Sequence, residues 1–203
     1  MSATVDALLP LSLLEAVRSV DAPDGDLATE WVPELRNKRF GLSDTVYAQI
    51  RRYTDAIKRR QRTAHDEAVA LAKLIGRRPD ADDVFHVAGR YLAREAYLTI
   101  PAATRRAIGF LPSFLSRPMA LRRVRRIAQR YLDGKVTRVG GYLLLAVQEP
   151  VTLESAPRAA GCGYYESTLR ELLRLLNVSG GAVEHVRCAG RGEGACEWRA
   201  EWR

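Results

Sequence analysis

Two of the chain's three cysteines lie at the ends of a short glycine-rich loop, in the stretch CAGRGEGAC from Cys188 to Cys196. If segments 182–188 and 195–202 pair as a hairpin, the two cysteines stand at the base of its loop. Directly opposed residues of such a pair have Cβ atoms about 4.5–5.5 Å apart. Thiols at that distance can share a tetrahedral metal ion, oxidise to a disulfide, or pack as small apolar side chains. A reducing compartment argues against the disulfide.

The second strand of this expected hairpin alternates between apolar and charged residues, which is typical of a strand with one buried face. On this pattern we expect Cys188 and Cys196 to point to the buried face, together with Val186 and Trp198.

The third cysteine, Cys162, lies between two glycines just before an expected helix. A thiol at a helix N-terminus is acidified by the helix dipole and could serve as a nucleophile. No base stands near it in the sequence, so metal ligation or burial is favoured over catalysis.

The pattern from Gly161 to Trp202 resembles the C-terminal part of the 4-vinyl reductase domain family. The resemblance is carried by Cys162, Tyr164, the leucine-rich helix 169–176, and the stretches VEHVRC, GRGEGAC and EWRAEW. This family is a small-molecule-binding module related in fold to subunits of the TRAPP transport complex. It occurs in bacterial sensors of aromatic compounds, in proteins linked to bacteriochlorophyll synthesis and in predicted hydrocarbon-binding proteins.

In some members of this family, cysteines around the loop hold a structural zinc ion together with a nearby acidic residue. The resemblance therefore implies a zinc site built on Cys162, Cys188 and Cys196, with reduced, metal-free cysteines as the alternative. The chain departs from the family in the helix after Cys162, where YYESTLREL lacks the usual glycines. That difference would narrow or reshape a ligand pocket.

The fourth ligand of such a site has three candidates. Glu184 is favoured first, because it shares the strand parity of Cys188. His185 is the rival, since imidazole is the better zinc ligand, and Glu193 in the loop is the third. Four residues of a straight strand span about 13 Å, so Glu184 needs a bulge or bend to share a metal with Cys188.

Aromatic and basic side chains could form a ligand site. Tyr164, Tyr165 and Trp198 could line an apolar pocket, or they could belong to an ordinary core. His86 and Arg90 lie four residues apart on the polar side of an expected helix, where they could bind an anion or face solvent.

We therefore expect a non-enzymatic module that binds or senses a small hydrophobic or aromatic molecule. By resemblance it would form a homodimer through its N-terminal helices. The alternatives are a protein-interaction scaffold without ligand and a basic nucleic-acid-binding protein. An enzyme is less favoured, because no acid–base set or cofactor motif is visible in the sequence.

The elements that must position these residues follow from apolar spacing. Helical periodicity predicts helices, and alternating or continuous apolar runs predict strands. The predicted helices are 8–20, 44–57, 66–75, 81–99, 119–132 and 164–177, and the predicted strands are 136–147, 182–188 and 195–202. Segment 100–118, with three prolines, is expected to be a loop.

This order predicts an α+β fold in which N-terminal helices pack on a small antiparallel sheet that ends in a hairpin. Residues 1–40 are expected to form an extension or dimerisation arm, and residues 41–203 a single ligand-binding domain.

The chain has 203 residues and a formal net charge of +8. This excess favours an anionic partner, although solvated helix faces also explain it. Two helices, RRYTDAIKRRQR and LRRVRRIAQRYLDGK, are basic enough to contact phosphates, and the second could lie on an anionic membrane. However, its apolar side is typical of a core-facing helix, and a nucleic-acid partner is not favoured. The lack of a long apolar run and the few cysteines predict a cytoplasmic protein without a transmembrane segment.

Overall fold

A computed structural model describes residues 3–22, 43–155, 160–177 and 182–202. It confirms the α+β class. The helices are α1 (Leu8–Asp21), α3 (Asp44–Lys58), α4 (His65–Gly76), α5 (Ala81–Leu98), α6 (Ala102–Phe110), α7 (Ser113–Tyr131) and α8 (Cys162–Leu175), with a 3-10 turn η2 (Ala189–Arg191). The strands are β1 (Thr4–Asp6), β2 (Arg62–Ala64), β3 (Gly134–Val139), β4 (Tyr142–Val147), β5 (Val183–Arg187) and β6 (Cys196–Glu201).

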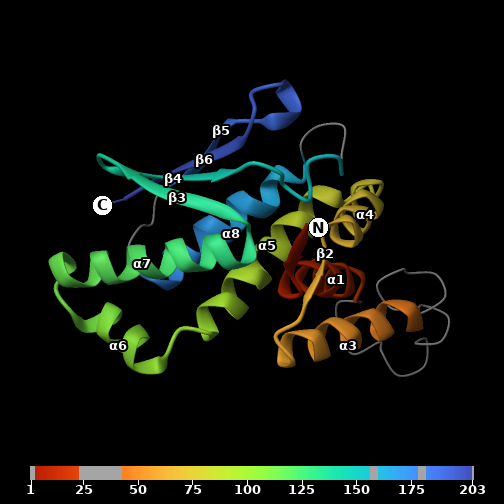
Figure 1. Ribbon diagram of the computed structural model, residues 1–203, viewed down its shortest axis with the longest axis horizontal. Coiled ribbons are helices and arrows are strands. Elements are labelled where there is room, and N and C mark those ends of the chain that lie inside the picture. Colours follow the sequence, from red (N-terminus) through yellow and green to blue (C-terminus); the bar gives the residue numbers. More distant parts are fainter. Residues whose placement is uncertain (1–2, 23–42, 156–159, 178–181, 203) are drawn as a thin grey trace.

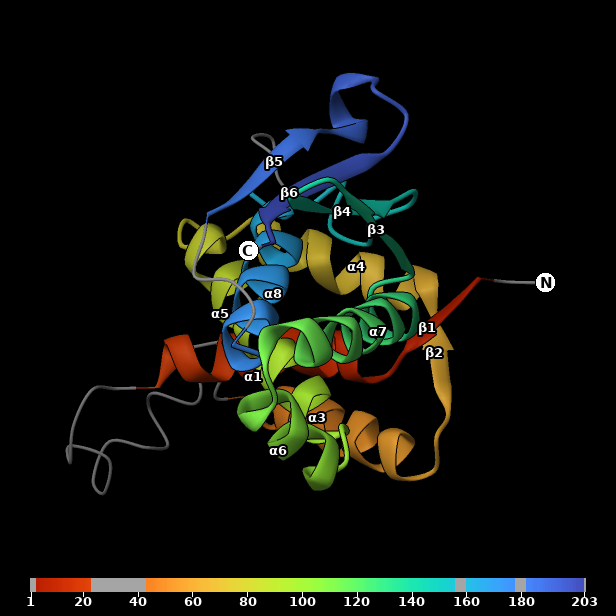
Figure 2. The same cartoon turned by 90° about the vertical axis from the view of Figure 1, so that its left-hand side faces the viewer.

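The main sheet is antiparallel, with strand order β3-β4-β6-β5 (Figure 1). Helix α7 packs under β3, and α8 packs under β5 and β6. Helix α5 packs on α8, α1 packs on α5, and α3 covers the far side of α1, so the helices form a stack beneath the sheet (Figure 2). The predicted C-terminal hairpin of β5 and β6 is therefore the part of the sheet that rests on the start of α8.

Helix α1 lies in the centre of this stack. Its sequence LLPLSLLEAV is apolar on nearly all sides, which is the pattern of a helix surrounded by other elements. Nine of its residues between Leu8 and Val17 are buried, and β1 just before it pairs with β2. The range 1–40, expected to be an extension or arm, therefore contributes its described part to the core. Residues 23–42 lie outside the described residues.

The expected loop 100–118 was wrong, because it contains α6 and the first turns of α7. Pro101 and Pro112 occupy the positions immediately before these two helices, where the missing N–H of proline costs no helical hydrogen bond. Two of the three prolines therefore mark helix starts, and only Pro118 lies inside a helix.

The single strand expected over 136–147 was also wrong, because the segment is a hairpin of β3 and β4. Val139 pairs with Tyr142 across a two-residue turn at Gly140 and Gly141. Gly140 has φ +58°, the left-handed conformation that such tight turns require. The two glycines were the signal for this turn within an otherwise continuous apolar run.

Helix α8 contacts α5 at very short range, since α5 carries a glycine at the crossing. A Cβ atom added to Gly89 would lie 2.2 Å from the backbone oxygen of Tyr164 and 2.1 Å from Ser167 Oγ. Thr168 Oγ1 donates a hydrogen bond to the Gly89 carbonyl at 3.2 Å. This close approach fixes the position of α8 relative to α5, and with it the position of Cys162 in the first turn of α8.

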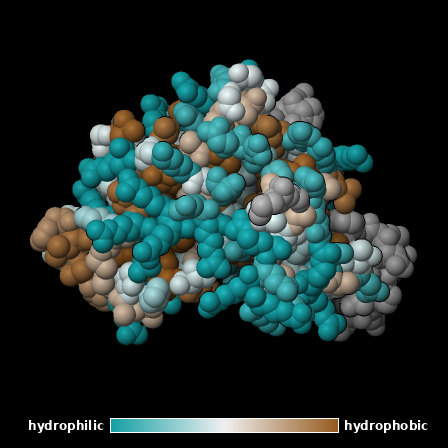
Figure 3. All heavy atoms as spheres, in the orientation of Figure 1, coloured by the Kyte–Doolittle hydropathy of each residue, from teal (hydrophilic) through white to brown (hydrophobic). Residues whose placement is uncertain are grey.

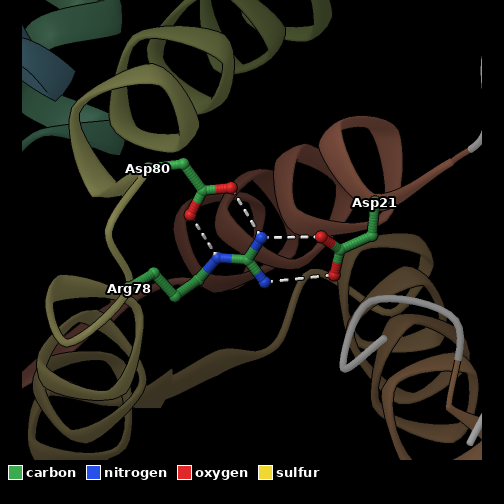
Figure 4. A network of polar contacts seen from close by, with 3 residues as sticks. All are labelled: Asp21, Arg78 and Asp80. Carbon is green, nitrogen blue, oxygen red and sulfur yellow. Dashed lines mark hydrogen bonds and ion pairs between the residues drawn. The ribbon is translucent and has the colours of Figure 1, made fainter. Parts of the chain in front are cut away.

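A network of charged side chains joins the end of α1 to the loop between α4 and α5 (Figure 4). The Arg78 guanidinium donates to both carboxylate oxygens of Asp21, at 3.1 and 2.6 Å, and to both of Asp80, at 2.8 Å. These hydrogen bonds raise the pKa of Arg78 and lower the pKa of Asp80. Charge-assisted bidentate pairs of this kind hold one geometry, so the network joins the end of α1 to the start of α5 in a defined way.

The seam between α5 and α8 provides a test of stability against pH. Glu171 on α8 accepts hydrogen bonds from Arg174, at 2.8 and 2.9 Å, and from Arg94 on α5, at 2.9 Å. The hydrogen bonds from Arg174 lower the pKa of Glu171 from its usual 4.5 to about 2. Because the folded pKa lies below the unfolded one, this contribution is present above pH 4.5 and is lost as the pH falls toward about 2.

We expect Glu171→Gln to unfold at a lower urea concentration at neutral pH and to lose part of the acid sensitivity of the wild type. Urea titrations between neutral pH and pH 2 measure both effects. Glu154→Gln, in an exposed pair with Lys73, is the control and should change little. If the free energy of unfolding changed equally with pH in the wild type and in Glu171→Gln, this role of Glu171 in the seam would be wrong.

Candidate metal centre

Four side chains from separate parts of the C-terminal third come together beneath the hairpin. Cys162, His185, Cys188 and Cys196 each offer one ligand atom, and these atoms all lie within 4.8 Å of one another. Cys162 begins α8, His185 lies in β5, Cys188 follows β5, and Cys196 begins β6. All three cysteines are buried free thiols. The expected three-cysteine cluster is therefore present, although its metal is not identified by the geometry.

A β-bulge decides which residue of β5 joins the cysteines. Arg187 pairs with Glu197 but His185 pairs with Trp198, so one extra residue, Val186, interrupts the register. The extra residue shifts the alternation by one position. His185 therefore points to the face of Trp198, whereas Val186, expected on that face, is 38% exposed.

Glu184, the first expected fourth ligand, lies on the other face. Its carboxylate accepts a hydrogen bond from Arg199 at 2.6 Å on the exposed side of the hairpin. The cluster contains His185, the rival candidate, and does not contain Glu184. The parity argument for Glu184 assumed an unbroken strand, and the bulge at Val186 removes that assumption.

Glu193, the third candidate, holds the loop that joins the two cysteines. Its carboxylate accepts a hydrogen bond from the Cys188 backbone N–H at 2.6 Å. Gly192 and Gly194 on either side have φ of +80° and +85°, which other residues adopt at a cost. The pattern GRGEG thus turns the chain sharply and returns the glutamate to the base of the loop.

The glycines on either side of Cys162 allow the chain to approach its neighbours closely. A Cβ atom at Gly161 would lie 2.4 Å from the Thr152 carbonyl oxygen, and one at Gly163 would lie 3.0 Å from the His86 ring. Thr152 Oγ1 also donates a hydrogen bond to the Gly161 carbonyl at 2.7 Å. The first turn of α8 is therefore fixed from both sides.

Hydrogen bonds favour a thiolate at one cysteine. The Cys162 thiol donates to Cys196, and the Ala189 N–H donates to Cys196 Sγ at 3.3 Å. The bond from Cys162 is the main cause that lowers the pKa of Cys196 to about 5, against desolvation. The same bond, with burial, raises the pKa of Cys162. Thiolates are the form in which cysteines bind metals. The backbone donor at Ala189 had no signal in the sequence.

The imidazole of His185 is fixed by stacking. Its ring lies 4.9 Å from that of Trp198 at an interplanar angle of 15°, and Tyr165 stacks on Trp198 at 4.9 Å and 25°. His185 Nε2 is buried and has no hydrogen-bond partner among the described residues. A buried nitrogen without a partner is costly, and coordination of a cation is one way to satisfy it.

The residues expected to bind a ligand lie around this centre in two groups. Tyr164, Tyr165 and Trp198 are fully buried. The Tyr164 hydroxyl is paired with Ser12 on α1, and the Tyr165 hydroxyl accepts from the Val151 N–H. His86 is half-buried against Gly163, and Arg90 is exposed on α5.

Two hollows lie on the helical side of the molecule. One, of about 270 Å³, is bounded by residues of α1, α3, α5 and α7, among them Leu8, Leu11, Ile57 and Tyr91. The other, of about 630 Å³, is an open groove lined by four arginines, Arg62, Arg123, Arg126 and Arg130. They share Thr99, Arg130 and Tyr131, so the two hollows adjoin.

The hydrogen bond from Cys188 to Glu193 gives a direct test of the loop. We expect Glu193→Ala to lower the free energy of unfolding by about 1 kcal/mol, because it removes a partly buried hydrogen bond to a charged acceptor. Arg191→Ala, an exposed change in the same loop, should cost less than about 0.5 kcal/mol. Urea denaturation measures both, and equal losses would contradict this role of the hydrogen bond between Glu193 and Cys188.

No helix in the described part of the chain is long and apolar enough to cross a bilayer. No protein-family model matches the sequence, and no curated protein is significantly similar to it. The arrangement of Cys162, His185, Cys188 and Cys196 is therefore the ground on which a function can be argued.

Proposed function

We propose that this chain is a non-enzymatic binding module whose C-terminal hairpin is held to α8 by a structural zinc ion. The observation that carries the proposal is the mutual distance of the four ligand atoms, at most 4.8 Å. Ligand atoms of a tetrahedral zinc site with Zn–S bonds of about 2.3 Å lie about 3.7 Å apart. Small side-chain rotations are enough to close that difference.

The donor set supports zinc and a structural role. Three cysteines and one histidine are a common ligand set for structural zinc, whereas iron–sulfur clusters generally take four cysteines. Catalytic zinc keeps one position for water or substrate, and here the protein supplies all four ligands from a buried site. One imidazole nitrogen of His185 completes the set of four ligand atoms.

The ion would act on the fold by joining segments that are distant in sequence. Cys162 precedes Cys188 by a helix and a strand, and β6 lies between β4 and β5 in the sheet. A cross-link between α8, β5 and β6 removes conformational freedom from the unfolded chain, and structural zinc contributes folding free energy directly. Without it, the hairpin would depend on strand pairing and on the stack at Trp198.

Metal analysis of protein purified without a histidine tag tests this site. We expect about one zinc ion per chain in the wild type. Cys188→Ser and His185→Gln should lose the metal and melt at lower temperature, because each removes one of the four ligands. A chelator should lower the melting temperature of the wild type in the same way.

Glu184→Gln is the matched control, since it changes the neighbouring residue on the opposite face of β5 and should retain the metal. If the wild type contains no metal and all three cysteines titrate as free thiols, the zinc proposal is wrong. If Glu184→Gln loses the metal and His185→Gln retains it, the assignment of the fourth ligand is wrong.

The ligand that we propose for the module is a small hydrophobic or aromatic molecule, in keeping with the resemblance to the 4-vinyl reductase domain family. Leu8, Leu11, Ile57 and Tyr91 form the apolar part of the lining of the hollow of about 270 Å³ and support this class, whereas most of the other lining residues are polar or charged. Its volume is close to the lower end of small-molecule sites. Burial raises the pKa of Tyr91 to about 12, and its phenol is a hydrogen-bond donor in the lining of this hollow. We further propose that the chain is a cytoplasmic homodimer.

Native mass spectrometry of the purified protein tests ligand binding. We expect a retained apolar molecule, and a melting temperature that rises with its occupancy. Ile57→Trp should displace it by filling the hollow, whereas Tyr47→Trp on the same helix, outside the hollow, should not. A chain that carries no small molecule but captures a protein partner would favour the alternative of an interaction scaffold.

A further inference from the structure

The turn between α6 and α7 exposes large apolar side chains at one end of the molecule. Phe110 is 89% exposed, Phe114 72%, Leu115 46% and Leu111 38%. Figure 3 shows them as the hydrophobic surface at its left edge, where α6 meets α7 in Figure 1. We call Phe110, Leu111, Phe114 and Leu115 the apolar tip. Apolar side chains gathered in this way usually mark an interaction surface.

Helices α6 and α7 with the turn between them, which we call the α6–α7 hairpin, also carry the net charge of the chain. Residues 102–131 contain eight arginines and neither lysine, aspartate nor glutamate. Removing these eight from the 32 basic residues of the chain leaves 24, which equals the number of acidic residues. The rest of the sequence is thus neutral by formal charge, and the whole excess of +8 lies on α6, α7 and the turn between them.

Packing holds this hairpin in place and leaves the apolar tip free. Ile108 on α6 and Val124 on α7 are buried, and Arg123 donates a hydrogen bond to Thr104 between the two helices. The Arg105 guanidinium lies over the Tyr97 ring at 5.3 Å, which joins α6 to α5. The tip is therefore presented by helices whose other faces are already in the core.

We propose that the α6–α7 hairpin docks on an anionic lipid surface, with the apolar tip in the headgroup–acyl boundary and the arginines against lipid phosphates. Helices with a basic face and exposed phenylalanine and leucine bind membranes in this way. Arg106 and Arg117 lie within about two helical turns of the tip and are exposed. The hairpin lies on the bilayer rather than across it, because no described helix can span one.

Charge distinguishes a lipid surface from the other occupants of this face. Two copies meeting tip to tip would each bring a hairpin of charge +8, and this repulsion opposes association. A nucleic-acid duplex would satisfy the arginines, but its bases are stacked inside the helix and its phosphate backbone gives no apolar surface to Phe110 and Phe114. An anionic bilayer satisfies both the charges and the exposed rings.

Vesicle flotation of the full chain tests the proposal. We expect binding to vesicles of equimolar phosphatidylcholine and phosphatidylglycerol, and weak binding to phosphatidylcholine alone. Each arginine near an anionic surface contributes about fivefold to partitioning, so binding should weaken as salt is added. Phe110→Ser/Phe114→Ser should reduce binding at least about tenfold, because burial of one phenylalanine ring is worth about that factor.

Leu74→Ser/Val139→Ser is the matched control, since it removes two other exposed apolar side chains from α4 and β3 and leaves the hairpin intact. It should bind vesicles as the wild type does. Arg106→Gln/Arg117→Gln should lose the preference for phosphatidylglycerol. Circular dichroism and thermal melting of each variant establish that it folds.

Three results would overturn the proposal. One is that the wild type binds neither vesicle, or binds both equally. Another is that Phe110→Ser/Phe114→Ser binds phosphatidylglycerol as well as the wild type does. The third is that the wild type binds duplex DNA with a steep salt dependence or dimerises in solution through the apolar tip, while showing no affinity for anionic vesicles.

Discussion

The close contact of α8 with α5 is the constraint on which the rest of the molecule depends. Gly89 lets the two backbones approach to a distance that any side chain would prevent, and the hydroxyl of Thr168 closes the contact with a hydrogen bond. That contact fixes the first turn of α8 against the sheet. Tyr164 on the same turn reaches Ser12 on α1, so the buried N-terminal helix and the C-terminal cluster share one support.

The α+β class and most helices could be predicted from apolar periodicity, because periodicity reports directly on which faces are buried. Segment 100–118 could not, since prolines there mark helix starts rather than breaks. The hairpin within 136–147 was hidden by an apolar run in which two glycines were the only turn signal. The all-round apolarity of α1 is typical of a buried helix, a signal that the expectation of an extension or arm over residues 1–40 did not use.

The proximity of Cys188 and Cys196 could be predicted from loop length and strand pairing, whereas the place of Cys162 beside them was implied by the resemblance to the 4-vinyl reductase domain family. The choice between His185 and Glu184 could not be predicted, since it depends on one extra residue in β5. A bulge depends on how both strands pair along their length, so the sequence of β5 alone does not reveal it. The expected face of Val186 was wrong for the same reason.

The chain concentrates two kinds of chemistry at separate places. Sulfur and nitrogen donors gather beneath the C-terminal hairpin, whereas arginines and exposed aromatic rings gather on α6 and α7. The cluster beneath the C-terminal hairpin is buried, so its side chains have little conformational freedom. The second place lies at the surface, where the rings of Phe110 and Phe114 are exposed. Different elements of the fold therefore supply the rigid cluster and the accessible surface.

The bulge at Val186 gives β5 a different register from that of a regular ladder. In a regular ladder Val186 would turn inward with its apolar side chain, but it would bring Glu184 inward as well and carry His185 outward. A ligand shared by His185 and Cys188 stabilises only the bulged pairing. An ion bound at this centre would therefore do more than add stability. It would favour the bulged register of β5 over the regular one, and it would keep the carboxylate of Glu184 out of the core.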